Sequence, residues 1–210
     1  MDNKVYDERE QWLNAAIILL INELFTKAGI QPHEWERRKY AVSCGFPIGY
    51  RGSRTGKVTL GQAFDPAISS NGTAEMFINP VMDDVVEVLL VLLHEMVHVF
   101  VGNHEGHKGA FANVAKAMGL QTPLTALMSA EGKYNASPLL ITEIRAIADI
   151  LGEYPHSKVD PQMRKKQGTR MLKISCTGCG FTARASAKWV SLIHSNSPCP
   201  VCSSATLITE

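Results

Sequence analysis

The sequence of 210 residues predicts an α+β fold, with helices and a small three-stranded sheet in one domain and a compact cysteine-bearing unit near the C-terminal end. Three observations support this prediction. Runs with helical spacing alternate with short β-prone runs up to residue 154, four cysteines form two spaced pairs, and charge is divided unevenly along the chain. A composition of 45% apolar and 20% charged residues excludes a disordered or collagen-like chain.

The formal net charge of +1 hides two regions of opposite sign. Residues 1–154 contain 13 basic and 18 acidic side chains, a formal charge of −5, whereas residues 155–210 contain 8 basic and 2 acidic ones, a formal charge of +6. Such asymmetry indicates two modules with different partners. We therefore expect a domain over residues 1–154, a basic linker over residues 155–169 and the cysteine-bearing unit over residues 170–210.

The first residues show neither the basic start nor the apolar stretch of a secretory signal, so we expect a reducing, cytoplasmic location. The most apolar stretch, residues 85–101, has only 17 residues and contains two glutamates and two histidines. It is too short and too polar to span a bilayer, which requires about 20 apolar residues. The sequence therefore predicts a buried helix at this place and no membrane partner.

The first elements follow from changes in apolar periodicity. Apolar residues between Trp12 and Leu24 have helical spacing, and Gly29 and Pro32 then supply a stop, which predicts a helix over residues 7–28. The following region loses this period and contains β-prone runs between turns rich in Gly, Pro, Ser and Asn. These runs predict three strands of one sheet, over residues 40–44, 57–64 and 74–78.

Later helices are predicted from their end signals. A pair of aspartates that ends at Asp84 places negative charge in the first turn of a helix that continues to Val101. Ser137 followed by Pro138 is a cap and first-turn signal for another helix. The two remaining expected helices cover residues 108–119 and 138–151.

The main candidate for chemistry is His94-Glu95-Met96-Val97-His98, an H-E-x-x-H motif inside the apolar helix. Residues four apart share a helix face, so both imidazoles are able to reach one zinc ion at the roughly 2.0–2.1 Å of Zn–N bonds. Glu95 then lies beside the metal, where a carboxylate takes a proton from zinc-activated water and passes it to a leaving amine. Ionisable groups in an apolar helix cost free energy unless paired or metal-bound, which favours a catalytic metal site over a hydrogen-bonded core cluster.

A catalytic zinc usually has three protein ligands, and the sequence leaves the third open. His104 has the offset of the pattern H-E-x-x-H-x-x-G-x-x-H, but Val101 stands where that pattern has glycine. His107 follows a turn and begins the next predicted helix, and spacing alone favours it no more than His104. A downstream glutamate, Glu131 or Glu143, is a more remote candidate.

Several features together resemble the SprT-like (SprT/Spartan) family of zinc metallopeptidases. Asn79-Pro80 closes a strand, an apolar helix carries the H-E-x-x-H motif, and Gly106-His107-Lys108-Gly109-Ala110-Phe111 follows after a loop. Lys108 stands where the family often has glycine. The resemblance implies a zincin-like domain, zinc ligands His94, His98 and His107, and Glu95 as the general base. It also implies an endopeptidase whose substrate lies extended along an edge strand near residues 75–78.

The C-terminal cysteines are Cys176 and Cys179, then Cys199 and Cys202 after 19 intervening residues, a spacing typical of a structural zinc site. Four thiolates complete a tetrahedron and leave no position for water. A unit of roughly 40 residues has too small a core to fold without such help. It resembles the zinc ribbon attached to SprT-like proteins, notably those of bacteriophages. We therefore expect two zinc ions per chain, one catalytic and one structural, whereas Cys44 is expected to be a small buried strand residue.

Basic residues precede and enter the cysteine-bearing unit, and one aromatic side chain accompanies them. Such residues neutralise phosphates and stack an unpaired base, so single- or double-stranded DNA is an expected partner besides the protein substrate. The resemblance likewise implies action on DNA-associated proteins, in the cytoplasm or at the nucleoid. The alternative is a non-proteolytic nucleic-acid or transcription-complex binding protein with structural zinc sites. The candidate nucleic-acid contacts are Arg164, Lys165, Lys166, Arg170, Lys188 and Trp189.

Overall fold

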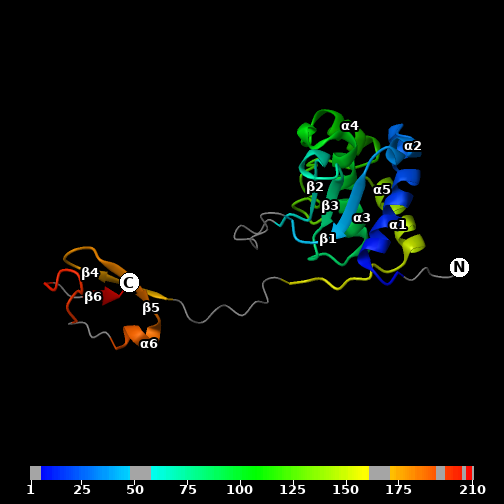
Figure 1. The fold of residues 1–210 in the computed structure, drawn as a ribbon. Helices are drawn as coiled ribbons and strands as arrows, with labels where there is room; N and C mark the ends of the chain where they lie inside the picture. The colour runs from blue at the N-terminus through cyan, green and yellow to red at the C-terminus, as the bar shows by residue number, and fades with distance from the viewer. Residues whose placement is uncertain (1–5, 48–57, 161–170, 193–196, 205–206, 210) are drawn as a thin grey trace. The chain divides into compact units, whose positions relative to one another are not determined.

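The computed structural model describes residues 6–47, 58–160, 171–192, 197–204 and 207–209. Contacts divide the chain into two compact units, Met1–Gln162 and Met163–Glu210, and this division falls within the predicted linker over residues 155–169 (Figure 1). Within the described part of the chain, no helix combines the length and hydropathy needed to cross a membrane. The four candidate nucleic-acid contacts Arg164, Lys165, Lys166 and Arg170 lie outside the described residues.

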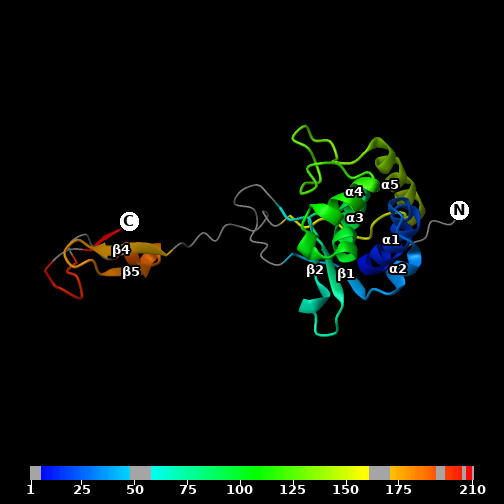
Figure 2. The ribbon, with the colours of Figure 1, turned by 90° about the horizontal axis from the view of Figure 1, so that it is seen from above.

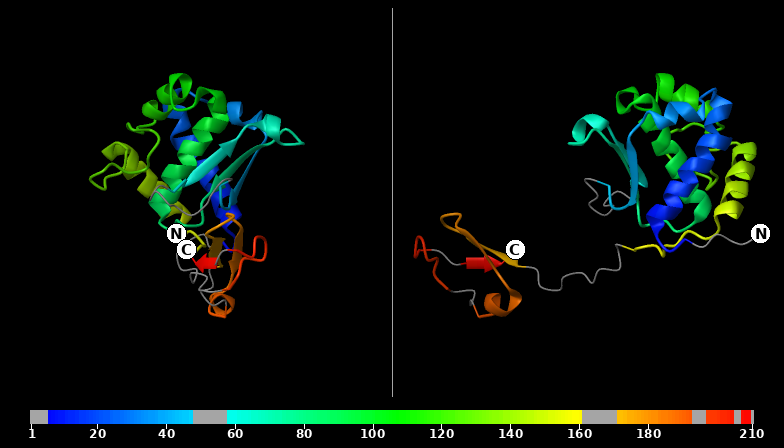
Figure 3. Two further views of the ribbon diagram at one scale, coloured as in Figure 1. Left: turned by 90° about the vertical axis from the view of Figure 1, so that its left-hand side faces the viewer. Right: turned by 45° about the vertical axis from the view of Figure 1, so that its right-hand side comes forward.

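The first unit is an α+β domain, as the sequence predicts. Its α-helices lie on one face of a small sheet (Figure 3). In chain order the elements are α1 (Arg9–Glu23), η1 (Phe25–Ala28), α2 (Pro32–Glu36), β1 (Tyr40–Cys44), β2 (Gly61–Phe64), η2 (Pro66–Ile68), β3 (Ala74–Ile78), α3 (Val85–Val101), η3 (Asn103–Glu105), α4 (Gly109–Ala117) and α5 (Pro138–Leu151).

The sheet has the order β1-β3-β2, with β1 parallel and β2 antiparallel to β3. The expectation of an edge strand near residues 75–78 is therefore wrong, because β3 is the central strand and pairs on both sides. The sequence does not reveal this order, since β1 and β3 pair across a crossover that includes β2. The strand at the edge beside helix α3 is β2.

Helix α3 is the centre of the core. It contacts β2 and β3 on one side and α1, α4 and α5 on the others. Its residues Leu89, Leu93 and Met96 are fully buried, and Trp12 and Leu20 of α1 pack into the same core. The two predicted end signals are confirmed, because Asp84 accepts a hydrogen bond from the Glu87 backbone and Ser137 accepts one from the Leu140 backbone.

The first predicted helix is too long. The α-helix ends at Glu23, and a 3₁₀ turn over Phe25–Ala28 replaces its last turn. Pro32 begins helix α2 instead of only ending the preceding structure, since proline suits the first turn and Gln31 and Glu34 form a capping box. Trp35 of α2 then packs edge-on against Phe25, with ring centroids 4.9 Å apart. The shortened first helix thus makes room for a helix that apolar periodicity did not indicate.

The chain beyond α5, including the first part of the predicted linker, lies on the first unit. Tyr154 is buried against Trp12, with ring centroids 4.9 Å apart. His156 Nε2 donates to the Pro80 carbonyl at 2.9 Å, and the Val159 backbone donates to the same oxygen at 2.8 Å. These contacts fix the chain beyond α5 to the segment that joins β3 and α3.

The described part of the second unit is a small antiparallel sheet with one short helix. Its elements are β4 (Leu172–Cys176), β5 (Thr182–Ala185), α6 (Ala187–Val190) and β6 (Leu207–Thr209), and the strand order is β5-β4-β6. Ile174, Cys176 and Cys199 are buried. The clustered cysteines are compatible with a zinc ribbon.

Candidate metal centre and cavity

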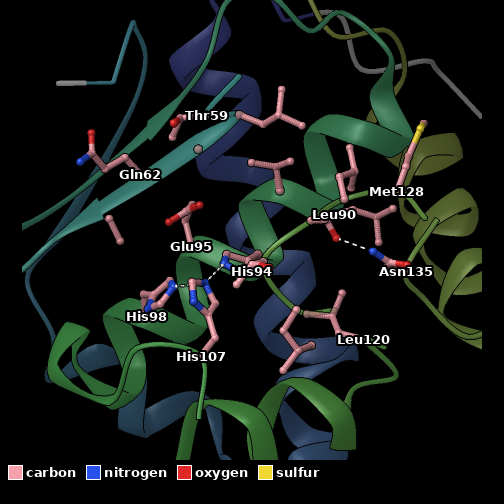
Figure 4. Close-up of a pocket in the computed structure, with 18 of the residues that line it drawn as sticks. Thr59, Gln62, Leu90, His94, Glu95, His98, His107, Leu120, Met128 and Asn135 are labelled. Carbon is pink, nitrogen blue, oxygen red and sulfur yellow. Dashed lines mark hydrogen bonds between the residues drawn. The ribbon is translucent and has the colours of Figure 1, made fainter. Parts of the chain in front are cut away.

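Three histidines converge at the open side of helix α3 (Figure 4). His94 and His98 lie one turn apart on α3, and His107 comes from the turn between η3 and α4. The Nε2 atom of His107 lies 3.1 Å from Nε2 of His94 and 3.2 Å from Nε2 of His98. The structure therefore brings together the three histidines of the predicted site.

The histidine nitrogens fit a metal ion better than a purely hydrogen-bonded cluster. One imidazole nitrogen carries at most one proton, so His107 Nε2 is able to donate to only one of its two close neighbours. Tetrahedral ligands at about 2.0–2.1 Å from zinc lie roughly 3.3–3.4 Å from one another, close to the separations found here. A cation at the centre satisfies all three nitrogens together.

The electrostatic environment keeps the histidines neutral, which is the form that binds metals. Burial, together with the neighbouring His98 and His107, lowers the pKa of His94 to about 3. Burial also lowers the pKa of His98 to about 4, and that of His107 below its usual value. Near neutral pH all three offer a lone pair.

The ring of Phe111 forms the floor beneath the histidines. Its centroid lies 5.0 Å from the ring centroids of His94 and His107 and 4.3 Å from that of His98. Phe111 is fully buried and lies four residues after His107. The motif that contains His107 also contains Phe111, but nothing in the sequence indicated that Phe111 packs against all three histidines.

Glu95 lies between helix α3 and strand β2 and is 6% exposed. Burial raises the pKa of Glu95 to about 8, and a hydrogen bond with the Ala63 backbone partly opposes this rise. The strand passes so close that a Cβ atom at Gly61 would lie 2.6 Å from both Glu95 Oε1 and Val91 Cγ1. Only glycine fits there without displacing the carboxylate.

Asn103 connects strand β2 to the turn that follows α3. Its Nδ2 donates to the Ala63 carbonyl at 3.0 Å. Ala63 thus contacts Glu95 through one hydrogen bond and Asn103 through another. Sequence analysis missed both Gly61 and Asn103, because these contacts depend on how the strand lies on the helix.

A cavity of about 880 Å³ opens beside the histidines (Figure 4). Residues of β2 and α3 line two sides, and the segment between α4 and α5 lines a third. Figure 2 shows this segment as a long excursion between the two helices. The volume lies in the range typical of ligand sites.

The other candidates for the third ligand lie elsewhere. The side chain of His104 is 76% exposed and lies 3.5 Å from a Glu105 carboxylate oxygen. Glu131 is exposed, and Glu143 of α5 forms an ion pair with Lys27. The geometry therefore separates His107 from the alternatives that spacing left open.

The four cysteines of the second unit also converge. The Sγ atoms of Cys176 and Cys202 are 3.7 Å apart, and those of Cys179 and Cys199 are 3.6 Å apart. Tetrahedral sulfur ligands at about 2.3 Å from zinc lie roughly 3.8 Å from one another, so this group also fits a metal. Backbone N–H groups of Cys179 and Gly178 lower the pKa of the Cys176 thiol, which favours the thiolate.

Three of the described basic and aromatic residues of the second unit, Arg184, Lys188 and Trp189, are exposed. Trp189 is 58% exposed, and Lys188 Nζ lies 5.6 Å from the centroid of its ring. Lys173 and Arg184 are directly opposite each other on β4 and β5.

Chemically, the first unit combines three neutral nitrogen ligands, a buried carboxylate and an accessible cavity. The second combines four sulfur ligands with a small core. Such sets bind divalent metals, the first with room for a further ligand. In comparisons of the chain with known proteins, no family model, no curated protein and no solved structure matches it.

Proposed function

We propose that the chain is a zinc-dependent endopeptidase with a zincin-like first unit and a zinc ribbon as its second. The observation that carries the proposal is the buried carboxylate of Glu95 beside three convergent histidines in an open cavity. A purely structural site has no need of a carboxylate next to its ligands, nor of access from outside. The sequence resemblance to SprT-like peptidases points the same way.

In the proposed reaction His94, His98 and His107 hold the zinc ion. When bound, this ion supplies Lewis acidity, which polarises a scissile carbonyl and lowers the pKa of the attacking water. The positive charge of a bound ion would oppose the rise in the pKa of Glu95, and the ionised carboxylate would accept the proton of that water and deliver it to the leaving amine. Gly61 and Ala63 support this role, because the strand beside the carboxylate limits where its side chain is able to lie.

The substrate peptide lies along β2, not along β3. The Asn79 backbone donates to the Leu60 carbonyl, so alternation in an antiparallel pair turns the backbone groups of Gly61 and Ala63 away from β3. The Ala63 carbonyl already accepts from Asn103. Gly61 is therefore the position at which an extended peptide pairs with the sheet edge.

DNA-associated proteins are the proposed substrates, in the cytoplasm or at the nucleoid. The exposed indole of Trp189, with Lys188 beside it, suits the stacking of an unpaired base. Arg184, which is exposed on strand β5, suits contact with a phosphate. In this proposal Lys188 and Trp189 bring the second unit to nucleic acid. The first unit then cuts protein held on the same nucleic acid.

The test compares the zinc-loaded full chain with Glu95→Gln on DNA-binding proteins, with and without single- and double-stranded DNA. Glutamine keeps the shape of the side chain but does not accept the proton, so metal content is retained and cleavage is lost. Equal cleavage by both chains contradicts the assignment of Glu95. No cleavage by the wild type under any condition favours the non-proteolytic nucleic-acid binding protein.

A further inference from the structure

The cavity has a second, apolar part beside the histidines. Leu90 lies one helical turn before His94 on α3 and therefore shares its face. Figure 4 shows Leu90, Leu120 and Met128 on the other side of His94 from His98. Leu90 and Leu120 are buried yet line the cavity. An apolar concavity thus begins within one helical turn of a metal-ligating side chain.

Hydrogen bonds from Asn135 hold the wall of this apolar part in place. Asn135 Nδ2 donates to the Ala126 carbonyl at 2.8 Å and to the Pro123 carbonyl at 3.3 Å, and its backbone donates to the Leu127 carbonyl at 2.9 Å. These hydrogen bonds give partners to three backbone carbonyl groups of the segment 121–128. The segment presents the apolar side chains of Leu124 and Leu127 to the cavity. A wall fixed in this way is formed before any ligand binds.

The charge of the lining selects against acidic ligands. Glu87 and Glu95 are carboxylates of the cavity, and no lysine or arginine is among the described residues that line it. Beyond the three histidines and the ion that they would hold, an aspartate or glutamate side chain against Leu90, Leu120 and Leu124 would meet no basic side chain and would lose its hydration. An apolar side chain, in contrast, is removed from water against leucines.

We propose that the space between Leu90 and the segment 120–128 is a subsite for a large apolar side chain, such as Leu, Met or Phe, next to the cleaved bond. This inference rests on the proposed endopeptidase function. A peptide paired with β2 at Gly61 passes beside His94, and its alternate side chains point toward α3. The peptide side chain that points toward α3 next to His94 enters the space lined by Leu90, Leu120 and Leu124.

The experiment uses the zinc-loaded full chain carrying Glu95→Gln, immobilised and exposed to a library of random octapeptides. Retained peptides are sequenced by mass spectrometry. We expect Leu, Met and Phe to be enriched over Asp and Glu by roughly tenfold or more, as for a pocket that discriminates by apolar contact. Leu124→Phe in the same chain fills the space and shifts the enrichment toward Ala and Val.

Two further variants keep the test decisive. Leu139→Phe adds the same ring on an exposed part of α5 away from the cavity and leaves the preference unchanged. Met128→Ala changes a partly exposed residue at the rim of the cavity, so this variant folds even if Leu124→Phe does not. It reduces the preference for large apolar residues several-fold. Retention without residue preference, no retention, or a preference that neither cavity variant alters overturns the subsite.

The wild-type chain on the same peptides separates the two proposals. Binding preference without any cleavage contradicts the endopeptidase and leaves the apolar subsite standing. Cleavage whose sites show no residue preference contradicts the subsite alone.

Discussion

The two candidate metal sites differ in the number of ligands and in what surrounds them. Three nitrogens converge in the first unit beside a buried carboxylate and a cavity, whereas four sulfurs converge in the second. Four ligands complete a tetrahedron, so the second site suits a structural role, and three leave a position for a reacting molecule. The comparison indicates that the number of protein ligands, more than the identity of the metal, distinguishes a site suited to a structural role from a site suited to catalysis.

The cores around the sites differ as well. Helix α3 is buried among α1, α4, α5 and the sheet, so the first unit has an extensive apolar core of its own. In the second unit Ile174 is the buried large apolar residue among those described. We therefore expect metal loss to abolish the fold of one unit and only the activity of the other.

The largest expected effect is on folding of the second unit. Cys199→Ser removes one of four ligands and much of the roughly 10–16 kcal/mol that structural zinc contributes in small domains, so this unit unfolds. Amide NMR signals of residues 172–176 should lose their dispersion while those of α3 remain. Cys44→Ser is the matched control, because Cys44 belongs to β1, and it leaves both sets of signals unchanged. A folded second unit in Cys199→Ser would break the comparison.

Gly61→Ala should lower the proposed peptidase activity without reducing the metal content of the first unit. The added Cβ displaces Glu95 or strand β2, and a misplacement of about 1 Å costs roughly 100-fold in rate. The measurement is kcat/KM together with zinc content per chain. Gly45→Ala is the control, since a Cβ there meets only Phe77 at an ordinary 3.4 Å. Full activity in Gly61→Ala would show that the close passage of β2 does not position Glu95.

Asn135→Ala should destabilise the first unit. The change removes two hydrogen bonds that Asn135 Nδ2 donates to the Ala126 and Pro123 carbonyls, and a hydrogen bond contributes roughly 0.5–1.5 kcal/mol to stability. We expect a loss of about 2 kcal/mol in the free energy of unfolding, measured by urea denaturation. Asn14→Ala, which removes an exposed hydrogen bond to the Glu10 carbonyl, should cost less than about 0.5 kcal/mol. Equal effects would contradict a fixed cavity wall.

The smallest effect is expected for Glu143→Gln. The ion pair with Lys27 is partly exposed to solvent, so its loss changes stability by at most about 1 kcal/mol. Zinc content should stay unchanged, whereas His107→Ala should reduce it. Metal analysis of the two variants thus tests the choice between the histidine and the glutamate that spacing had left open. Zinc loss in Glu143→Gln would reverse the assignment.

Local signals predicted much of the fold. The bounds of β1, β3 and α5 agree with the sequence prediction, because alternation and the Ser137 cap act within a few residues. The position of β3 in the sheet was not predictable, since it depends on pairing with β1 across about 30 residues of intervening chain. Helix α2 was missed because Pro32 was interpreted as a stop although its capping box was present.

The residues of the candidate site were likewise predictable only where they depend on local sequence. His94, Glu95 and His98 come from one helix and were predictable from spacing alone. His107 required the turn at Gly106, which has a φ of 55°, and sequence spacing did not distinguish it from His104. The segment 120–135 has no periodicity, so neither its cavity-lining leucines nor the role of Asn135 was foreseen.

The hydrogen bond from Asn103 to Ala63 also bears on how copies of the chain behave toward one another. An unpaired strand edge is a template for association with other strands, and proteins suppress this risk by shortening or covering such edges. Strand β2 has only four residues, and the outward carbonyl of Ala63 is already occupied. The hydrogen bond that orders the proposed site therefore also occupies one of the pairing positions at this edge of the sheet.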